Sequence, residues 1–317
     1  MATSVACADG APSILEPRSD AARRVEGLWW LMFWISAVVV AVVIGFIAVA
    51  VRRRRAERGP VDHRAVRWGE PFIAVAGLGV SGVILAGTFV VSLRVLDALS
   101  DPPERPDLSI EVVGRNWWWE VRYPGFVTAN EITIPAGETV ELRLSTVDVI
   151  HSFWVPQLQV KKDHVPGVDN TMWLVADQPG RYRGQCAEYC GLQHAHMEFD
   201  VVALPAAEFD RWLAGQADPA PAPAAPEAVR GRANFLSSSC AGCHRVRGTT
   251  ADGELGPDLT HLASRETIGA GLMPLTPENL ADFVSNPQDD KLGVTMPPTE
   301  ITGVQLDELV AYLLELE

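Results

Sequence analysis

The 317-residue chain is poor in basic side chains, with 26 lysines and arginines against 40 aspartates and glutamates. Its net charge of -14 and its pI near 4.9 argue against nucleic-acid partners, because phosphate recognition needs clustered basic side chains on the folded domains. At this length the chain is expected to form more than one domain, so no single fold has to explain all of it.

Cysteine is scarce and unevenly distributed, with five residues in the whole chain. Four of them form two close pairs, each followed by a histidine, which favours metal or haem chemistry over a disulfide framework. The pairs are Cys186 with Cys190 and Cys240 with Cys243. The fifth, Cys7, ends a lipoprotein-like "SVAC" but follows no apolar run that could act as a signal sequence. We therefore predict an N-terminal tail over residues 1–26 in which this thiol has no function.

Charge is absent from two long stretches, Gly27 to Val51 and Pro71 to Leu93. Each would be about 35 Å long as a helix, enough to cross a bilayer, whereas a helix buried in a soluble core needs neither this length nor a second copy. The loop between them holds seven arginines, which places it in the cytoplasm by the positive-inside bias. Residues 27–93 are thus predicted to form two spans in a bacterial plasma membrane, with both termini and all later domains on the periplasmic side.

Residues 104–215 have the composition of an all-β domain. Short segments rich in β-branched and aromatic residues are separated by Pro, Gly, Asn or Asp, which favours a β-sandwich or a small barrel. These segments are "LSIEVVG", "NWWWEVRY", "NEITIP", "ETVELRLS", "HSFWV", "TMWLVA" and "YRGQC". A short helical piece, "PAAEFDRWLAG", is expected to close the domain.

Proline and alanine alternate in "QADPAPAPAAPEA", residues 216–228, which predicts an extended linker that tethers the last domain, so that the domain need not be fixed to the β-domain. Residues 229–317 are predicted to be all-helical, because "PENLADFVSN" and "TGVQLDELVAYLLEL" have amphipathic spacing. From Gln216 onward there are fifteen acidic residues against six basic ones. This acidity keeps a small domain soluble or attracts a basic protein partner.

The sequence "CAGCH", Cys240 to His244, has the spacing for covalent haem attachment, in which two thiols form thioethers and the histidine binds iron. A zinc or dithiol site is disfavoured because no second metal-binding pair follows. Met296 in "VTMPP" is the preferred second axial ligand, and Met273 in "GLMPLTP" is its competitor. The stretch resembles the class I cytochromes c, whose methionine lies in an M-P loop ahead of the C-terminal helix, and this resemblance favours Met296.

The segment "CAEYCGLQHAHM", residues 186–197, combines two thiols with histidine and methionine. A disulfide suits an oxidising compartment but explains neither His194 nor Met197, and zinc binds thioethers poorly. Copper suits thiolate, thioether and imidazole ligands together. Two cysteines exceed the needs of a mononuclear blue-copper site, which suggests thiolates that bridge two copper ions. His151 in "VDVIHSFWVP" is the candidate for a further ligand.

The motifs "VIHSFWVP", "KKDHVPG", "GQCAEYCGLQHAHM" and "GRNWWWEVRYP", with two preceding spans, closely resemble subunit II of cytochrome c oxidase. The added haem domain resembles the caa3-type form. The resemblance implies a cupredoxin-like Greek-key domain over residues 104–215, a class I cytochrome c domain over 229–317, and a dinuclear copper A centre. The implied copper ligands are His151, Cys186, Cys190, His194, Met197 and the backbone carbonyl of Glu188.

The resemblance also implies roles outside the copper ligands. The Glu188 carboxylate would bind magnesium or manganese at the interface with subunit I, a role that suits a hard oxygen ligand. Electrons would enter copper A through Trp117, whereas Trp118 and Trp119 are expected to pack in the sheet. His164 and His196 are expected not to bind metal.

In function, the resemblance implies that electrons pass from cytochrome c or a cytochrome bc complex to haem c, then to copper A, then to subunit I. There, in a complex with other oxidase subunits, oxygen would be reduced to water with proton translocation. A copper A subunit of a nitric oxide reductase remains an alternative. A free-standing membrane electron carrier or a copper-handling assembly factor is disfavoured, because it would need neither a second span nor Glu188. A quinol-oxidising relative would lack the two thiolates.

Overall fold

The computed structural model describes residues 12–56, 69, 71–102 and 104–317. The chain forms two compact units, Asp20–Pro102 and the remainder, and each is described by itself. Cys7 and most of the arginine-rich loop lie outside the described residues.

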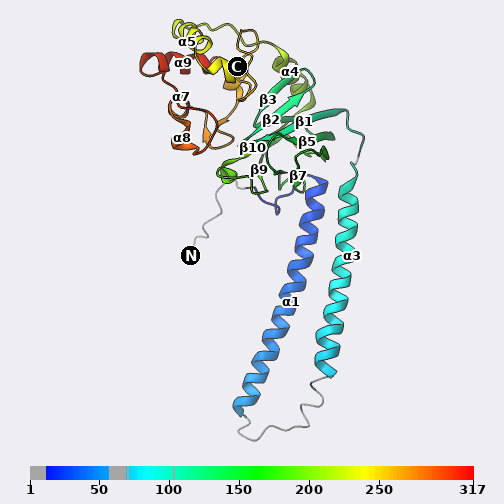
Figure 1. The fold of residues 1–317 in the computed structure, drawn as a ribbon. Coiled ribbons are helices and arrows are strands. Elements are labelled where there is room, and N and C mark those ends of the chain that lie inside the picture. The colour runs from blue at the N-terminus through cyan, green and yellow to red at the C-terminus, as the bar shows by residue number, and fades with distance from the viewer. Residues whose placement is uncertain (1–11, 57–68, 70, 103) are drawn as a thin grey trace, which may run out of the picture. The chain divides into compact units, whose positions relative to one another are not determined.

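The unit Asp20–Pro102 is a helical hairpin. The helix α1 (Asp20–Ala56) is followed by a π-helical segment η1 (Ile73–Val80) that continues into α3 (Ser81–Ser100), and α1 and α3 run alongside each other (Figure 1). Both helices are long and apolar enough to cross a bilayer. The helix α1 extends beyond the predicted span at both ends, and Arg53, Arg54 and Arg55 occupy its last turn, where the helix dipole favours positive charge.

The β-domain consists of two five-stranded sheets. The first sheet has the order β3 (Phe126–Ala129), β2 (Trp118–Tyr123), β1 (Leu108–Arg115), β5 (Val140–Thr146) and β8 (Asn170–Leu174). The second has the order β4 (Glu131–Pro135), β10 (Glu198–Leu204), β9 (Gly180–Cys186), β6 (His151–Trp154) and β7 (Lys162–His164). Parallel pairs β1–β5 and β4–β10 interrupt the otherwise antiparallel order. This is the cupredoxin-like sandwich that the sequence predicted.

Aromatic side chains fill the interior of this sandwich. Trp119 is fully buried, and its ring lies 5.3 Å from that of Phe199 and 6.1 Å from that of Phe153. Trp118 lies on the opposite face of β2, half-buried under the guanidinium of Arg115. Alternate residues of a strand point to opposite faces, so the expected packing on the core holds for Trp119 and not for Trp118.

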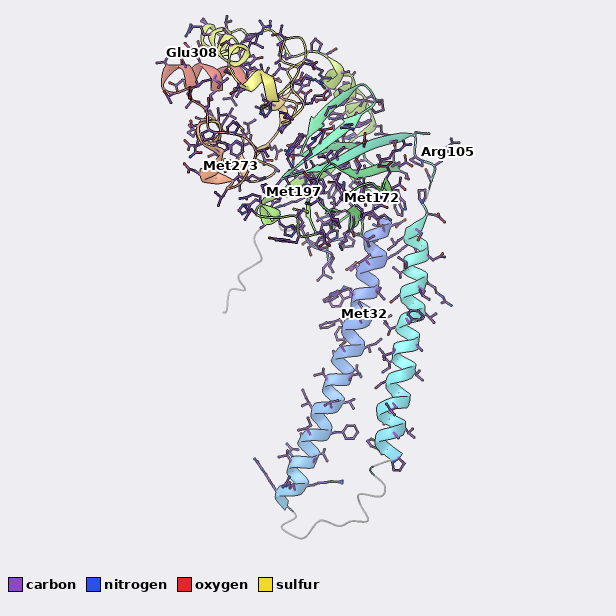
Figure 2. All side chains as sticks on the ribbon, in the orientation of Figure 1. Met32, Arg105, Met172, Met197, Met273 and Glu308 are labelled. Carbon is purple, nitrogen blue, oxygen red and sulfur yellow. The ribbon has the colours of Figure 1, made fainter. Side chains whose placement is uncertain are left out.

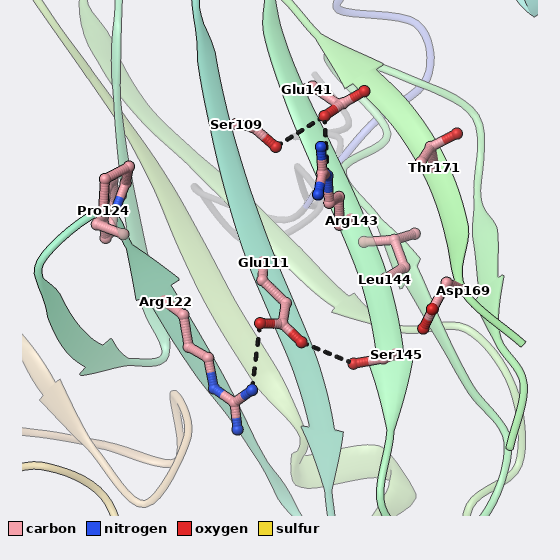
Figure 3. A pocket seen from close by; sticks show the side chains of 11 residues that line it. Ser109, Glu111, Arg122, Pro124, Glu141, Arg143, Leu144, Ser145, Asp169 and Thr171 are labelled. Atoms are coloured by element: carbon pink, nitrogen blue, oxygen red, sulfur yellow. Dashed lines mark hydrogen bonds and ion pairs between the residues drawn. The ribbon is translucent and has the colours of Figure 1, made fainter. Parts of the chain in front are cut away.

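The outer face of the first sheet carries a charged hollow, shown in Figure 3. Glu111 accepts hydrogen bonds there from Arg122 and Ser145, and Glu141 accepts from Ser109 and Arg143. These side chains satisfy one another, and the residues that line the hollow include none of the predicted metal ligands.

The C-terminal part of the chain is mainly helical, as predicted. Its elements are α4 (Ala206–Ala217), α5 (Pro226–Ser237), α6 (Cys240–Cys243), η3 (Leu262–Ser264), a small hairpin of β11 (Thr267–Ile268) and β12 (Met273–Pro274), α7 (Pro277–Ser285), α8 (Pro287–Asp290) and α9 (Val304–Leu313). The helix α4 closes the β-domain, where Trp212 packs on Tyr123 and Phe126. Both α4 and α5 reach into the predicted linker, so only residues 218–225 lie between them.

The linker is not the only connection between the helical domain and the β-domain. Glu266 forms an ion pair with Arg181 at 3.1 Å, and the backbone N–H of Glu266 donates to the Glu131 carboxylate at 2.9 Å. Arg265, buried at the same place, donates to the hydroxyl of Thr128. In the structure the helical domain is therefore docked, whereas the linker composition alone predicted a tethered domain that need not be fixed to the β-domain.

Helices α5 and α9 cross closely at Gly231, where a Cβ atom would lie 1.8 Å from the backbone oxygen of Glu308. We expect Gly231→Ala to push the two helices apart and to destabilise the helical domain by about 1–3 kcal/mol, the usual cost of overpacking. Calorimetric unfolding of the purified chain measures this as a lower Tm. The matched control is Gly215→Ala in α4, where a Cβ would meet open space and a helical glycine is replaced at a gain of up to about 1 kcal/mol. Equal Tm values for the two variants would contradict the close crossing.

Candidate copper and haem sites

The predicted copper loop connects β9 to β10 and folds back on itself. The strand β9 ends at Cys186, a short 3-10 turn spans His194–His196, and β10 begins at Glu198. The backbone N–H of Cys186 donates to the carbonyl of Met197 at 2.9 Å, so the two ends of the loop lie side by side. Gly191 supplies the positive φ of 117° that the turn needs.

All six predicted copper ligands lie around the two thiols. The Cys186 Sγ lies 3.7 Å from the Cys190 Sγ, 4.0 Å from His151 Nδ1 and 3.2 Å from the carbonyl oxygen of Glu188. The Cys190 Sγ lies 3.7 Å from His194 Nδ1 and 3.8 Å from the Met197 Sδ. A disulfide needs sulfur atoms about 2.05 Å apart, so the thiols are free. Soft sulfur and imidazole donors at these separations fit two copper ions.

His151 reaches this group from a distant part of the chain. It begins β6, and the pairing of Phe153 with Cys186 in β9 places it beside the copper loop although 35 residues separate it from Cys186. Gly114 allows the approach, because a Cβ at that position would lie 2.6 Å from the His151 ring.

Asp148 holds the His151 ring in one orientation. The Nε2–H of His151 donates to Asp148 Oδ1 at 2.7 Å, which leaves Nδ1 free to face the thiols. Asp148 also accepts from the backbone N–H groups of Asn116 and Val149, both at 2.7 Å. Burial raises the pKa of Asp148, but these hydrogen bonds outweigh it and hold the pKa below its usual value. The carboxylate is therefore charged and fixed before any metal binds, as carboxylate partners of metal-binding histidines commonly are.

The two thiols are in hydrogen-bonding contact, with their sulfur atoms 3.7 Å apart. A hydrogen bond from Cys190 lowers the pKa of Cys186 to about 3, and the same bond raises the pKa of Cys190 far above its usual value. Such a pair titrates as a unit, holding one thiolate and one thiol near neutral pH. Loading both cysteines with metal therefore has to release the remaining proton.

Glu188 lies within the copper loop, and Trp117 contacts the loop from outside it. The carbonyl of Glu188 faces Cys186, whereas its carboxylate is 44% exposed and lies 3.8 Å from the amine of Lys161, so it is accessible to a further cation. The indole Nε1–H of Trp117 donates to the carbonyl of Cys190 at 2.9 Å. Trp117 is thus in direct contact with the loop that carries both thiols.

His164 and His196 take no part in this group. His164 is buried, donates from Nδ1 to the carbonyl of Ser145 at 2.7 Å, and has a pKa lowered to about 4 because burial disfavours its charged form. His196 is exposed and bonds to Gln193 at 3.0 Å. Among the described residues, the buried cluster of metal-binding side chains consists of His151, Cys186 and Cys190. Neither His164 nor His196 belongs to it.

The predicted haem attachment site lies on α6, whose ends are Cys240 and Cys243. His244 follows directly, and its Nδ1–H donates to the carbonyl of Pro257 at 2.8 Å, which leaves Nε2 available to bind iron. Burial lowers the pKa of His244 and keeps the ring neutral. Gly256 makes room for it, because a Cβ there would lie 2.5 Å from the His244 ring. Two half-buried free thiols and an oriented neutral imidazole fit a covalently bound haem.

The two candidate methionines occupy different surroundings. Met273 lies on β12, pairs with Ile268 and packs against the apolar core of the helical domain (Figure 2). Met296 lies in the segment between α8 and α9, where its carbonyl accepts from Gln288 at 3.2 Å. Packing in the core accounts for Met273, so Met296 stays the preferred axial ligand.

Sequence reasoning missed Asp148. A signal was present, since an acidic residue stands three positions before the histidine in "DVIH". The spacing alone does not show whether the carboxylate meets the ring, because residues 147–150 form a loop.

Comparison with known proteins gives matches to both modules. The family model described as cytochrome c oxidase subunit II, periplasmic domain, matches residues 126–204, and the cytochrome c model matches residues 228–317. A cytochrome c oxidase subunit 2 from Alkalihalophilus pseudofirmus is 33% identical over 311 residues, covering 96% of this chain and 90% of that protein. Another, from Bacillus sp. (strain PS3), is 33% identical and covers 74% of this chain and 70% of that protein.

A solved structure is also similar to part of the chain. The periplasmic domain of subunit II of cytochrome oxidase from Bradyrhizobium japonicum is 30% identical and covers 36% of this chain and 95% of that domain, with a TM-score of 0.34. The sequence matches run through both the copper module and the haem module.

Asp148→Asn tests the orientation of His151. An asparagine amide can donate to Nε2 and favour the wrong tautomer, so we expect copper affinity to fall about 10- to 100-fold, as is typical when the partner of a metal-binding histidine is lost. Copper titration of the apo-protein, followed by thiolate-to-copper absorption, measures the change. Asp169→Asn, in the charged hollow of Figure 3, is the control and should leave the affinity unchanged. Unaltered affinity in Asp148→Asn would show that the carboxylate does not orient the ligand.

Proposed function

The chain belongs to the cytochrome c oxidase subunit II family, and we propose that it is the subunit II of a caa3-type oxidase, with its cytochrome c domain fused to the copper domain. The observation that carries this proposal is the convergence of two thiols, two imidazoles, a thioether and a carbonyl on one loop of a chain that also has a CxxCH haem site. The relative matched over 96% of the chain includes both parts.

In the proposed centre, two copper ions would be held by the thiols of Cys186 and Cys190, the side chains of His151, His194 and Met197, and the Glu188 carbonyl. In the haem domain, Cys240 and Cys243 would attach the porphyrin, and His244 and Met296 would bind its iron. Copper A and haem c supply one-electron carriers when bound. The protein's own contribution is to exclude water and fix the ligands, since both thiols and His151 are buried and Asp148 orients the imidazole.

The direction of electron flow is proposed from this arrangement. Cytochrome c or a cytochrome bc complex donates electrons to the haem domain, and they leave through the copper domain to subunit I, where oxygen is reduced and protons are translocated. Trp117 supports this order, because its ring is hydrogen-bonded to the copper loop at Cys190. The Glu188 carboxylate, whose side chain is 44% exposed, would share a magnesium or manganese ion with subunit I.

The two membrane helices anchor the chain. We propose that it is a multi-pass protein of the bacterial plasma membrane, with the copper and haem domains and both termini on the periplasmic side. Other oxidase subunits would surround the hairpin, whose apolar side chains face outward in the described residues.

The native complex tests the proposal. Purified from membranes, it should contain two copper ions and one covalent haem for each copy of this chain, and it should consume oxygen when supplied with reduced cytochrome c. Metal analysis, the haem spectrum after denaturation and an oxygen electrode measure these quantities. Nitric oxide reduction without oxygen uptake would overturn the oxidase assignment and favour the nitric oxide reductase alternative.

Met296→Ala tests the axial ligand. Loss of the thioether should abolish the low-spin c-type spectrum and lower the reduction potential of the haem, because methionine ligation raises it. Optical titration of the purified complex measures both. Met273→Ala is the matched variant and should keep the spectrum, since its side chain packs in the helical core. The reverse pattern would assign the ligand to Met273.

A further inference from the structure

Lys291 is more deeply buried than any other lysine or arginine in the part of the chain that the structure describes. Of the 26 basic residues only three are lysines, and two of these, Lys161 and Lys162, are exposed. Lys291 is 2% exposed, although it belongs to the strongly acidic helical domain, in which it is the single lysine. A fully buried lysine is unusual unless its amine is paired.

The amine of Lys291 uses all three of its donors on backbone carbonyls. Its Nζ donates to Trp117 at 2.9 Å, to His196 at 2.7 Å and to Gly269 at 2.5 Å. The first two acceptors belong to the β-domain and the third to the helical domain. These three carbonyls form a cage around the amine. Since an ammonium group has three donors, every donor has an acceptor.

The two residues that follow Lys291 also contact the β-domain. Gln193 in the copper loop donates to the carbonyl of Leu292 at 2.7 Å. A Cβ on Gly293 would lie 2.9 Å from Leu192 and 3.7 Å from the Trp117 ring. The segment 291–293 therefore lies against both the copper loop and the indole of Trp117.

The chemistry of the cage favours lysine over arginine in a chain otherwise rich in arginine. A compact ammonium can direct three hydrogen bonds from one nitrogen, whereas a guanidinium presents a planar fork. Burial lowers the pKa of the Lys291 amine to about 7, and the nearby carboxylate of Glu198 opposes this shift. Without the carbonyls, burying this group would be strongly unfavourable.

We propose that Lys291 is a positioning residue that fixes the helical haem domain on the copper loop at Trp117. This inference rests on the proposed function and adds to it the device that docks the two redox domains. The carbonyls it binds are those of Trp117, the residue proposed to receive electrons, and of His196, which precedes the ligand Met197. Removing the amine would leave the linker, residues 218–225, the contacts at Arg181 and Arg265, and the hydrogen bonds of Gln193 with Leu292 and of Glu198 with Ala270 to hold the domain.

Lys291→Met in the intact oxidase complex tests the proposal, because methionine keeps an unbranched apolar side chain up to the ε position and removes the amine with its donors. Each hydrogen bond from a charged group is worth about tenfold or more in an equilibrium constant, so the docking equilibrium constant should fall about 10-fold or further. Flash reduction of the haem, followed at the copper absorbance, measures transfer between the domains. We expect it to slow about 10-fold in Lys291→Met and to stay unchanged in the exposed control Lys162→Met.

Metal content and the haem spectrum separate this effect from misfolding and from failure of the proposed function. Full loading of copper and haem with wild-type transfer rates in Lys291→Met would overturn the role of the lysine alone. A wild-type complex without copper or oxygen uptake would instead overturn the proposed function.

A second measurement needs no variant. Acylation of the wild-type complex with an amine-reactive ester, read by mass spectrometry, should modify Lys161 and Lys162 and leave Lys291 unmodified. Modification of all three lysines at similar rates would show that the amine is not held in the cage and would contradict the proposal.

Discussion

The pairing of β6 with β9 is the constraint on which the copper site depends. It sets Phe153 opposite Cys186, and by doing so brings His151 and its partner Asp148 to the loop that contains the thiols. A shift of one residue in this register would turn His151 away from the thiols, because side chains alternate between the faces of a strand. The packing of Phe153 on Phe199 and Trp119 holds the register, since each ring is buried between the sheets.

The second constraint is the docking of the helical domain. Trp117 connects the two parts, because its indole donates to Cys190 while its carbonyl accepts from Lys291. A short linker keeps the local concentration of the tethered domain high, roughly in the millimolar range. Concentration alone does not set orientation, however, and electron transfer depends on the separation of the carriers. Specific contacts at Lys291, Gln193 and Glu266 supply that orientation.

Much of the architecture could be predicted from the sequence. The length of the two uncharged apolar runs predicted both long apolar helices. The seven predicted strand segments correspond to strands of the structure. The strands β3, β7 and β10 were not picked out, because "FVTA" and "KDH" are brief and "EFDVVAL" directly follows the ligand motif. The spacing in "CAEYCGLQHAHM" and "CAGCH" identified the metal and haem chemistry, since each motif places several ligands within a few residues of one another.

The sequence by itself determined which residue types could hold copper and haem, the order of the two matched modules and the two long apolar helices, because these depend on residue identity and on local spacing. Only the tertiary structure decided that Asp148 orients His151 and that Lys291 joins the domains. The reason for Lys291 is physical: its partners are backbone carbonyls of Trp117, His196 and Gly269, and every residue has such a carbonyl. No pattern of side chains marks which carbonyls will converge, and only the fold brings these three segments to one point.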